Sequence, residues 1–196
     1  MTEAVRKFMD ISIKIALLLF VVRCVFSWGS LSEAINTKNY CDFGYSLFGF
    51  AGEVIGAVAL VMAAFDKWWW KWKPLNMLAG GMPILSKKYT GTIKYEWKNV
   101  THSKETKLEI RQTFLSVTVK FGSDESSSNT VSGVIETINN EKQLVYIYLN
   151  TPEAQLQGNS PIHYGTTMLK IEDPKHITGE YYTSRLTRGH MDFNAV

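Results

Sequence analysis

The sequence predicts a two-helix transmembrane hairpin followed by an all-β domain, an antiparallel barrel of about eight strands. Two long apolar segments lie within residues 1–73, whereas residues 86–196 alternate apolar and polar side chains. A membrane helix buries a continuous apolar stretch, and a strand alternates its side chains between two faces. Residues 74–85, which include PLNMLAGGMP, interrupt both patterns and are expected to form a linker.

The two apolar segments are the expected membrane spans. Residues 11–28 read ISIKIALLLFVVRCVFSW, and residues 43–65 read FGYSLFGFAGEVIGAVALVMAAF. A bilayer core of about 30 Å needs roughly 20 helical residues, so the second segment is long enough and the first is marginal in length and charge. A cleavable signal peptide is the alternative for the first segment, but the charged and bulky residues from Arg23 to Trp28 make a poor cleavage region.

Basic residues are concentrated at the outer ends of the two spans. The turn between the spans, residues 29–42, contains only Lys38, whereas the outer ends carry Arg6, Lys7, Lys67, Lys71 and Lys73. The positive-inside rule therefore places both termini in the cytoplasm and the turn outside. The segment Asp66–Lys73, DKWWWKWK, contains four of the six tryptophans. We expect it to form a belt at the membrane interface, where indole rings and lysines meet lipid headgroups.

Charged and small residues within the spans predict helix–helix contacts. Glu53 lies near the middle of its span, where an unpartnered charge costs at least a few kcal/mol. Arg23 lies at a comparable depth in the antiparallel neighbour, so we expect the two side chains to pair. Gly49, Gly52, Glu53 and Gly56 share one helix face, and the Gly52-x-x-x-Gly56 pattern lets helix backbones approach closely. This face serves either packing within the hairpin or self-association into a homo-oligomer.

The β domain is expected to begin with a strand over residues 89–97. Further strands are expected at residues 105–121, 130–138, 143–149, 163–172 and 177–193, with a solvated loop, GSDESSSN, over residues 122–129. The runs 105–121 and 177–193 exceed the usual length of about 5–6 residues, so each is expected to bend or split. Closing the sheet into a lipocalin-like barrel removes its exposed edges, and an open sandwich is the alternative architecture.

The last run of strand-like sequence carries the candidate site. Alternation puts Tyr181, Thr183, Arg185 and Thr187 on one face together with the apolar residues at both ends of the run. This face should therefore line the barrel interior. A guanidinium that is withdrawn from water must be paired or must bind an anion. The alternative is a structural contact in which Arg185 lies across Trp97 by a cation–π interaction.

Composition argues against several classes of function. Residues 1–85 carry 8 Lys/Arg and 6 Asp/Glu, and residues 86–196 carry 13 and 12, so neither part has the basic surface that a nucleic-acid polymer requires. The two cysteines and four histidines show no metal-ligand spacing. No nucleophile–base pair, carboxylate dyad or glycine-rich phosphate loop stands out. We therefore expect no metal, no cofactor and no catalytic residues.

Two N-terminal spans, a β domain and the motif GEYYTSRLTRG at residues 179–189 together resemble the two-transmembrane β-barrel effectors of bacterial CBASS antiphage defence. The architectural resemblance covers the whole chain. It implies that the barrel binds a cyclic dinucleotide made by a partner nucleotidyltransferase after infection. It further implies that the membrane segments oligomerise in the inner membrane and disrupt it, so that the cell dies before phage release.

The side chains of the barrel are compatible with such a ligand. A cyclic dinucleotide presents two phosphate anions and two flat bases, which call for cations, aromatic faces and hydroxyl groups. The candidate ligand-binding residues are Arg185, Tyr181, Thr183, Thr187, Tyr95, Trp97, Tyr146 and Tyr148. The alternative function is a membrane-tethered, lipocalin-like carrier or envelope assembly factor with an apolar ligand, and a weaker one is an enzyme with a barrel-lined active site.

Overall fold

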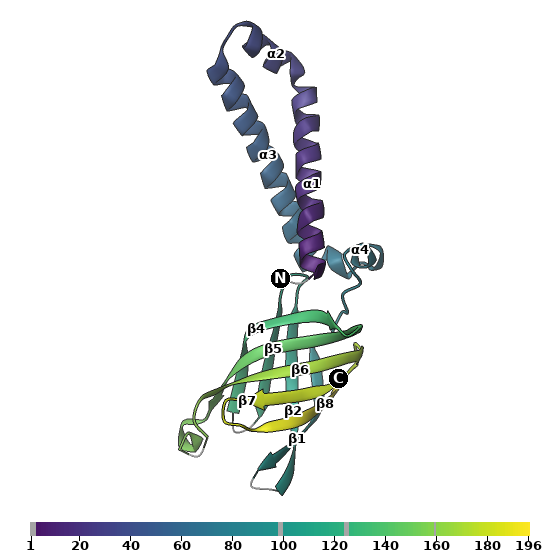
Figure 1. The fold of residues 1–196 in the computed structure, drawn as a ribbon, viewed down its shortest axis with the longest axis vertical. Helices are drawn as coiled ribbons and strands as arrows, with labels where there is room; N and C mark the ends of the chain where they lie inside the picture. The colour runs from purple at the N-terminus through teal and green to yellow at the C-terminus, as the bar shows by residue number, and fades with distance from the viewer. Residues whose placement is uncertain (1–2, 98–99, 124–125, 159) are drawn as a thin grey trace. The chain divides into compact units, whose positions relative to one another are not determined.

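The computed structural model describes residues 3–97, 100–123, 126–158 and 160–196. The chain divides into two compact units, Glu3–Gly80 and Gly81–Val196. The first unit contains the helices and the second contains the strands (Figure 1).

The helical unit contains more helix than the sequence predicted. Its elements are α1 (Glu3–Phe26), α2 (Trp28–Asn36), α3 (Tyr40–Lys67), the 3₁₀ helix η1 (Trp69–Lys71) and α4 (Lys73–Leu78). Much of the predicted turn is therefore helix α2, and the side chain of Asn39 caps α3 by accepting a hydrogen bond from the backbone N–H of Asp42 at 3.3 Å. The predicted linker contains α4 in its first part, because Pro74 lies in the first helical turn, where its missing N–H costs nothing.

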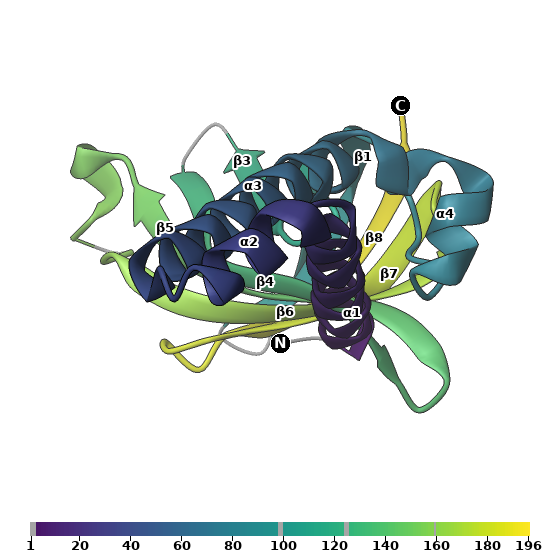
Figure 2. The ribbon, with the colours of Figure 1, turned by 90° about the horizontal axis from the view of Figure 1, so that it is seen from above.

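Helices α1 and α3 run antiparallel and are joined through α2 (Figures 1 and 2), and side chains of α1 and α3 touch at two levels. The rings of Phe8 and Phe65 stack with their centroids 4.5 Å apart. Towards the other end of the pair, Arg23 Nε donates a hydrogen bond to Glu53 Oε2 at 2.8 Å, and the guanidinium also lies 4.2 Å from the centre of the Phe50 ring. The predicted Arg23–Glu53 ion pair is thus present in the structure.

The glycines of α3 do not pack against α1. A Cβ atom added at Gly49, Gly52 or Gly56 would meet no heavy atom within 4 Å. Glu53 of this face meets α1 through Arg23, whereas the glycines beside it have open space around an added Cβ.

Among the described helices, α3 is long and apolar enough to cross a membrane. Helix α1 is long, but Asp10, Lys14 and Arg23 interrupt its apolar stretch, and it is not apolar enough by the same criterion. The structure thus supports one of the two predicted spans.

The predicted tryptophan belt needs a correction. Trp68, Trp69 and Trp72 are exposed, as an interfacial belt requires, but Trp70 is fully buried. Trp70 therefore contributes to packing and not to a surface that meets lipid headgroups.

The β unit is a closed antiparallel meander of eight strands in which each strand pairs with its sequence neighbours and β8 pairs with β1 (Figure 1). The strands are β1 (Lys88–Trp97), β2 (Val100–Gln112), β3 (Val117–Ser123), β4 (Ser126–Ile138), β5 (Glu141–Pro152), β6 (His163–Asp173), β7 (His176–Thr183) and β8 (Arg188–Ala195). The barrel is confirmed and the open sandwich is wrong. Both long runs split as predicted, into β2 and β3 and into β7 and β8.

The predicted loop over residues 122–129 is mostly strand. Gly122 pairs with Ser127, and Ser128 pairs with Asn150 of β5. Serine has a low intrinsic preference for strands, but backbone pairing on both sides of β4 overrides that preference.

Apolar residues fill one end of the barrel. The fully buried members of this core are Leu108, Leu144, Leu169, Ile177 and Phe193. The chain enters β1 at this end, where the Tyr89 hydroxyl accepts a hydrogen bond from the Ser86 N–H at 2.9 Å and donates one to the Pro174 carbonyl. The opposite end, where the β5–β6 and β7–β8 connections lie, contains the pocket described below.

Gly179 of β7 is expected to be essential for this packing, because a Cβ atom there would lie 1.9 Å from the carbonyl oxygen of Met168 on β6. We expect Gly179→Ala to lower the free energy of unfolding by about 1–3 kcal/mol, the usual cost of overpacking. The matched control is Gly122→Ala on β3, where the added Cβ meets nothing within 4 Å. Urea denaturation of the detergent-solubilised chain measures both, and equal stabilities would contradict the prediction.

Candidate functional site

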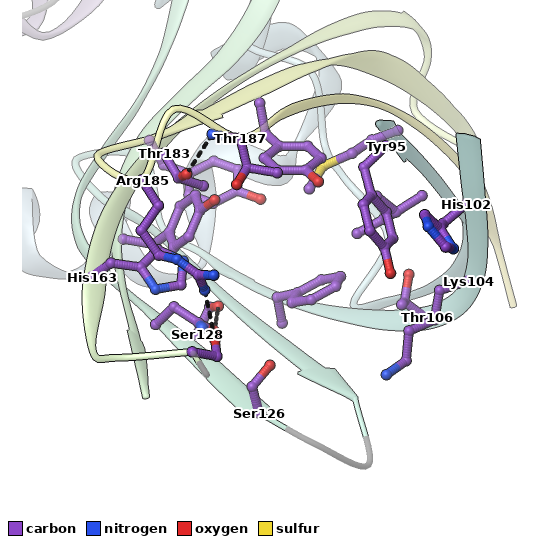
Figure 3. A pocket seen from close by; sticks show the side chains of 18 residues that line it. Tyr95, His102, Lys104, Thr106, Ser126, Ser128, His163, Thr183, Arg185 and Thr187 are labelled. Atoms are coloured by element: carbon purple, nitrogen blue, oxygen red, sulfur yellow. Dashed lines mark hydrogen bonds between the residues drawn. The ribbon is translucent and has the colours of Figure 1, made fainter. Parts of the chain in front are cut away.

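A pocket of about 420 Å³ opens at the end of the barrel opposite the apolar core (Figure 3). Its volume falls within the usual range of small-molecule sites, about 300–1,000 Å³. Its lining comes from all eight strands and two of the loops and consists of Ile93, Tyr95, His102, Lys104, Thr106, Phe121, Ser126, Ser128, Tyr146, Tyr148, Asn150, Ser160, His163, Tyr181, Thr183, Arg185, Thr187 and Met191.

The pocket brings together seven of the eight residues that the sequence proposed for ligand binding. These are Tyr95, Tyr146, Tyr148, Tyr181, Thr183, Arg185 and Thr187. The eighth is Trp97, whose side chain lies outside the described residues, and so does the alternative contact between Trp97 and Arg185.

Two of these residues lie on a turn and not, as predicted, on a strand. The chain leaves β7 at Thr183 and enters β8 at Arg188, so Arg185 and Thr187 belong to the connection between them. The backbone N–H of Thr183 donates to the Thr187 carbonyl at 2.9 Å, and the Thr187 N–H donates to Thr183 Oγ1 at 3.2 Å. Leu186 has a positive φ of 61°, which reverses the chain while the side chains of Arg185 and Thr187 still line the pocket.

Arg185 is half-buried at one side of the pocket mouth. Its Nη1 donates a hydrogen bond to Ser160 Oγ at 2.7 Å, which ties the β7–β8 turn to the loop between β5 and β6. His163, at the start of β6, lies near Arg185 (Figure 3), and its Nδ1 is 2.8 Å from the Pro161 carbonyl. The hydrogen bond to Ser160 thus fixes the guanidinium at the pocket mouth.

Tyrosine rings form the floor of the pocket. Tyr146 and Tyr148 point inward from β5 with ring centroids 5.9 Å apart. The ring of Tyr148 lies against Gly165, where a Cβ atom would come within 2.2 Å of its Cζ. A side chain at position 165 would occupy the space that the Tyr148 ring fills, so β6 and β5 together determine where this ring lies.

Burial affects the ionisation of these rings. It raises the pKa of Tyr146 to about 12 and the pKa of Tyr181 to about 12, and burial with neighbouring tyrosines also raises the pKa of Tyr148. The phenols are therefore neutral at physiological pH, and each can donate a hydrogen bond as well as offer a ring face.

A second wall of the pocket was missed in the sequence. It comes from β2, where His102, Lys104 and Thr106 alternate along the strand and line the pocket. The ring of His102 stacks on the ring of Tyr95, with their centroids 5.4 Å apart. The sequence places the start of this strand at residue 105, whereas β2 begins at Val100. The alternation of Thr106 with the buried Leu108 was the signal that could have extended the inward face back to Lys104.

Further polar residues were missed because they lie in expected loops or at the end of β5. Ser126 and Ser128 enter the pocket from β4, Ser160 from the β5–β6 connection and His163 from the start of β6. Ser128 Oγ donates a buried hydrogen bond to Asn150 Oδ1 at 2.7 Å. This bond fixes the orientation of the Asn150 amide inside the pocket.

The lining as a whole is suited to an anion with flat groups. Lys104 and Arg185 supply two fixed positive charges, and the described lining residues include no Asp or Glu. Hydrogen bonds from charged donors to phosphate are about twice as strong as those between neutral groups. Aromatic faces stack on nucleobases of any sequence. The pocket therefore combines phosphate-binding and base-stacking groups.

Comparison with known proteins agrees with this chemistry. Residues 81–195 match a family described as "Cap15, cyclic dinucleotide receptor domain". A curated protein of Staphylococcus schleiferi, CD-NTase-associated protein 15, is 30% identical over 131 residues, which cover 67% of this chain and 70% of that protein. The family match spans nearly the whole β unit.

The raised tyrosine pKa values predict an alkaline limit to stability. Above pH 10 the unfolded chain ionises Tyr146 and Tyr181, whereas the folded barrel keeps them neutral up to about pH 12. The unfolded state then binds fewer protons, so stability is complete below pH 10 and falls as the pH rises across this window. Tyr146→Phe should reduce the slope of unfolding free energy against pH by about one proton.

Urea denaturation at a series of pH values measures this slope. Tyr164→Phe is the matched control, because the Tyr164 side chain is 57% exposed on the neighbouring strand. An identical slope for Tyr146→Phe and the parent chain would show that Tyr146 ionises in the folded barrel as readily as in the unfolded chain.

Proposed function

The chain belongs to the family of Cap15 cyclic dinucleotide receptors, which are CBASS effectors, and on that premise we propose how it works. The barrel binds a cyclic dinucleotide. Binding leads the chain to oligomerise through its membrane segments and to disrupt the bacterial inner membrane, which causes abortive infection. The chain is a receptor and effector in this proposal, not an enzyme.

The observation that carries the proposal is the composition of the pocket. It contains Lys104 and Arg185, four tyrosines and no carboxylate among its described lining residues. An apolar ligand, as a lipocalin-like carrier would hold, would cover these two cations and offer them no anion. A phosphate diester gives them one. The pocket therefore favours the receptor over the carrier.

Each group of lining residues has a role in this proposal. Arg185 binds a phosphate of the ligand, because its guanidinium is already held at the mouth by Ser160. Tyr95, Tyr146, Tyr148 and Tyr181 receive the bases. Thr183 and Thr187 offer hydroxyl groups to the edges of a base.

We propose further that α1 and α3 both cross the inner membrane, with both termini in the cytoplasm. The charges that make α1 polar are paired: Lys14 Nζ lies 2.7 Å from Asp10 Oδ2, and Arg23 Nε lies 2.8 Å from Glu53 Oε2. Pairing lowers the cost of charges in lipid. The exposed tryptophans that follow α3 then lie at the cytoplasmic interface.

The open glycine face of α3 is the proposed contact between copies of the chain. Glu53 is engaged by Arg23, and Gly49, Gly52 and Gly56 beside it have no neighbour within 4 Å. Small residues allow close approach of helix backbones in lipid, where van der Waals packing drives association. A second copy is thus the occupant that this face suits.

Removal of Arg185 tests the ligand site. We expect Arg185→Ala to weaken the binding of a cyclic dinucleotide roughly ten- to a hundred-fold, the loss of one charge-assisted hydrogen bond. Arg188→Ala is the matched control, because Arg188 is exposed at the start of β8 and does not line the pocket. Calorimetric titration of the detergent-solubilised chain with cyclic di-AMP, cyclic di-GMP and cyclic GMP–AMP measures both. Failure of the parent chain to bind any cyclic dinucleotide would refute the receptor function.

Leucine substitutions test the membrane contact. We expect Gly52→Leu and Gly56→Leu to prevent ligand-induced assembly, because the added side chains keep the helix backbones apart, while the barrel of each separate chain keeps its own ligand affinity. Val61→Leu is the control, since Val61 is 54% exposed and lies about 180° around α3 from Gly52 and about 140° from Gly56. Chemical crosslinking in vesicles, with and without ligand, measures assembly. If both glycine variants assemble like the parent chain, the glycine face has no part in oligomerisation.

A further inference from the structure

The pocket wall contains a buried hydroxyl group, that of Thr106. Thr106 lies on β2 and is only 6% exposed, and its Oγ1 has no hydrogen-bond partner in the part of the chain that the structure describes. A buried polar atom without a partner costs about 1–3 kcal/mol. Thr106 also lines the pocket, so a bound molecule could supply the missing partner.

Lys104 lies on the same inward face of β2, two residues before Thr106. Figure 3 shows these two side chains on one side of the pocket and Arg185 on the other. Beside them, His102 stacks on the ring of Tyr95 at 5.4 Å. The β2 wall therefore combines a fixed cation, a hydroxyl group and an aromatic face.

The two cations are held by unrelated parts of the fold. Arg185 comes from the β7–β8 turn and is tied to the β5–β6 loop through Ser160. Lys104 comes from a strand that pairs with β1, where Lys104 is opposite Ile93. The two cations therefore enter the pocket from opposite sides (Figure 3), where each can meet a different phosphate of one ligand.

We propose that Lys104 and Thr106 form a second phosphate subsite across the barrel from Arg185. This inference rests on the proposed function and deepens it. Lys104 supplies charge to the second phosphate of a cyclic dinucleotide, and Thr106 Oγ1 donates a hydrogen bond to one of its oxygens. The pocket then selects ligands that carry two phosphates, and a nucleotide with one phosphate satisfies only one of the two subsites.

Paired variants of β2 test the subsite. Lys104→Ala should weaken the binding of cyclic di-AMP, cyclic di-GMP or cyclic GMP–AMP, whichever the parent chain binds best, roughly ten- to a hundred-fold. Lys107→Ala makes the same charge change on the exposed outer face of β2 and should leave the affinity unchanged. Calorimetry on the full chain in detergent measures both.

Thr106→Val separates ligand binding from structure. Valine keeps the shape of threonine and removes the unpartnered hydroxyl, so the melting temperature should stay the same or rise. The affinity for the cyclic dinucleotide should nevertheless fall about five- to ten-fold, the loss of one ordinary hydrogen bond. A residue with only a structural role would not show this combination.

The double variant distinguishes two subsites from one. If Lys104 and Arg185 bind different phosphates, the free-energy effects of Lys104→Ala and Arg185→Ala add in the double variant. If Lys104→Ala binds as tightly as Lys107→Ala, or if Thr106→Val loses no affinity, the second subsite is wrong while the receptor function stands. If the parent chain binds no cyclic dinucleotide, the receptor function itself fails.

Discussion

Hydrogen bonding between β1 and β8 is the interaction on which the rest of the β unit depends. The pairing runs from Tyr89 opposite Ala195 to Tyr95 opposite Gly189. It closes the sheet into a barrel, so that alternate residues along the strands face one interior. Apolar side chains fill the end of this interior where β1 begins, and the opposite end holds the pocket. Closure therefore produces the core and the site together.

The division of the interior explains how the barrel tolerates its polar lining. Leu108 and Phe193 exclude water from the core end, whereas Arg185 and Lys104 lie half-buried where the pocket opens to solvent. A half-buried cation retains part of its hydration and is also close enough to the low-dielectric wall for a phosphate to bind strongly. The neutral phenols of Tyr146 and Tyr181 complete the site without adding negative charge that would repel an anion.

The proposed function requires that ligand binding in the β unit be coupled to assembly of the helical unit. A ligand in the barrel promotes assembly of the membrane helices only if it binds the assembled chains more tightly than the separate ones. The helical unit contributes an ion pair between Arg23 and Glu53 and an open glycine face. The ion pair joins α1 and α3, and in the proposed function the glycine face meets other copies. That proposal thus places ligand binding and membrane contact in different parts of the chain and links them through assembly.

The sequence by itself determined the elements with a strong period. The apolar run of α3 and the inward face that carries Tyr181 and Thr183 follow from local spacing, because helix and strand periodicities depend on nearby residues alone. The pairing of Arg23 with Glu53 followed from their similar depth in two antiparallel spans. The usual strand length also indicated that the run 177–193 would split into two strands. It did not indicate that Arg185 would lie on the turn between them.

Tertiary structure decided which of these faces meet. The serines of β4 became strand because β3 and β5 supply hydrogen-bond partners on either side, which no local preference for serine indicates. Lys104 and Arg185 line one pocket because barrel closure and register bring β2 and the β7–β8 turn around the same space. These contacts join residues far apart in the chain, so their energies depend on the closed barrel and not on any local pattern.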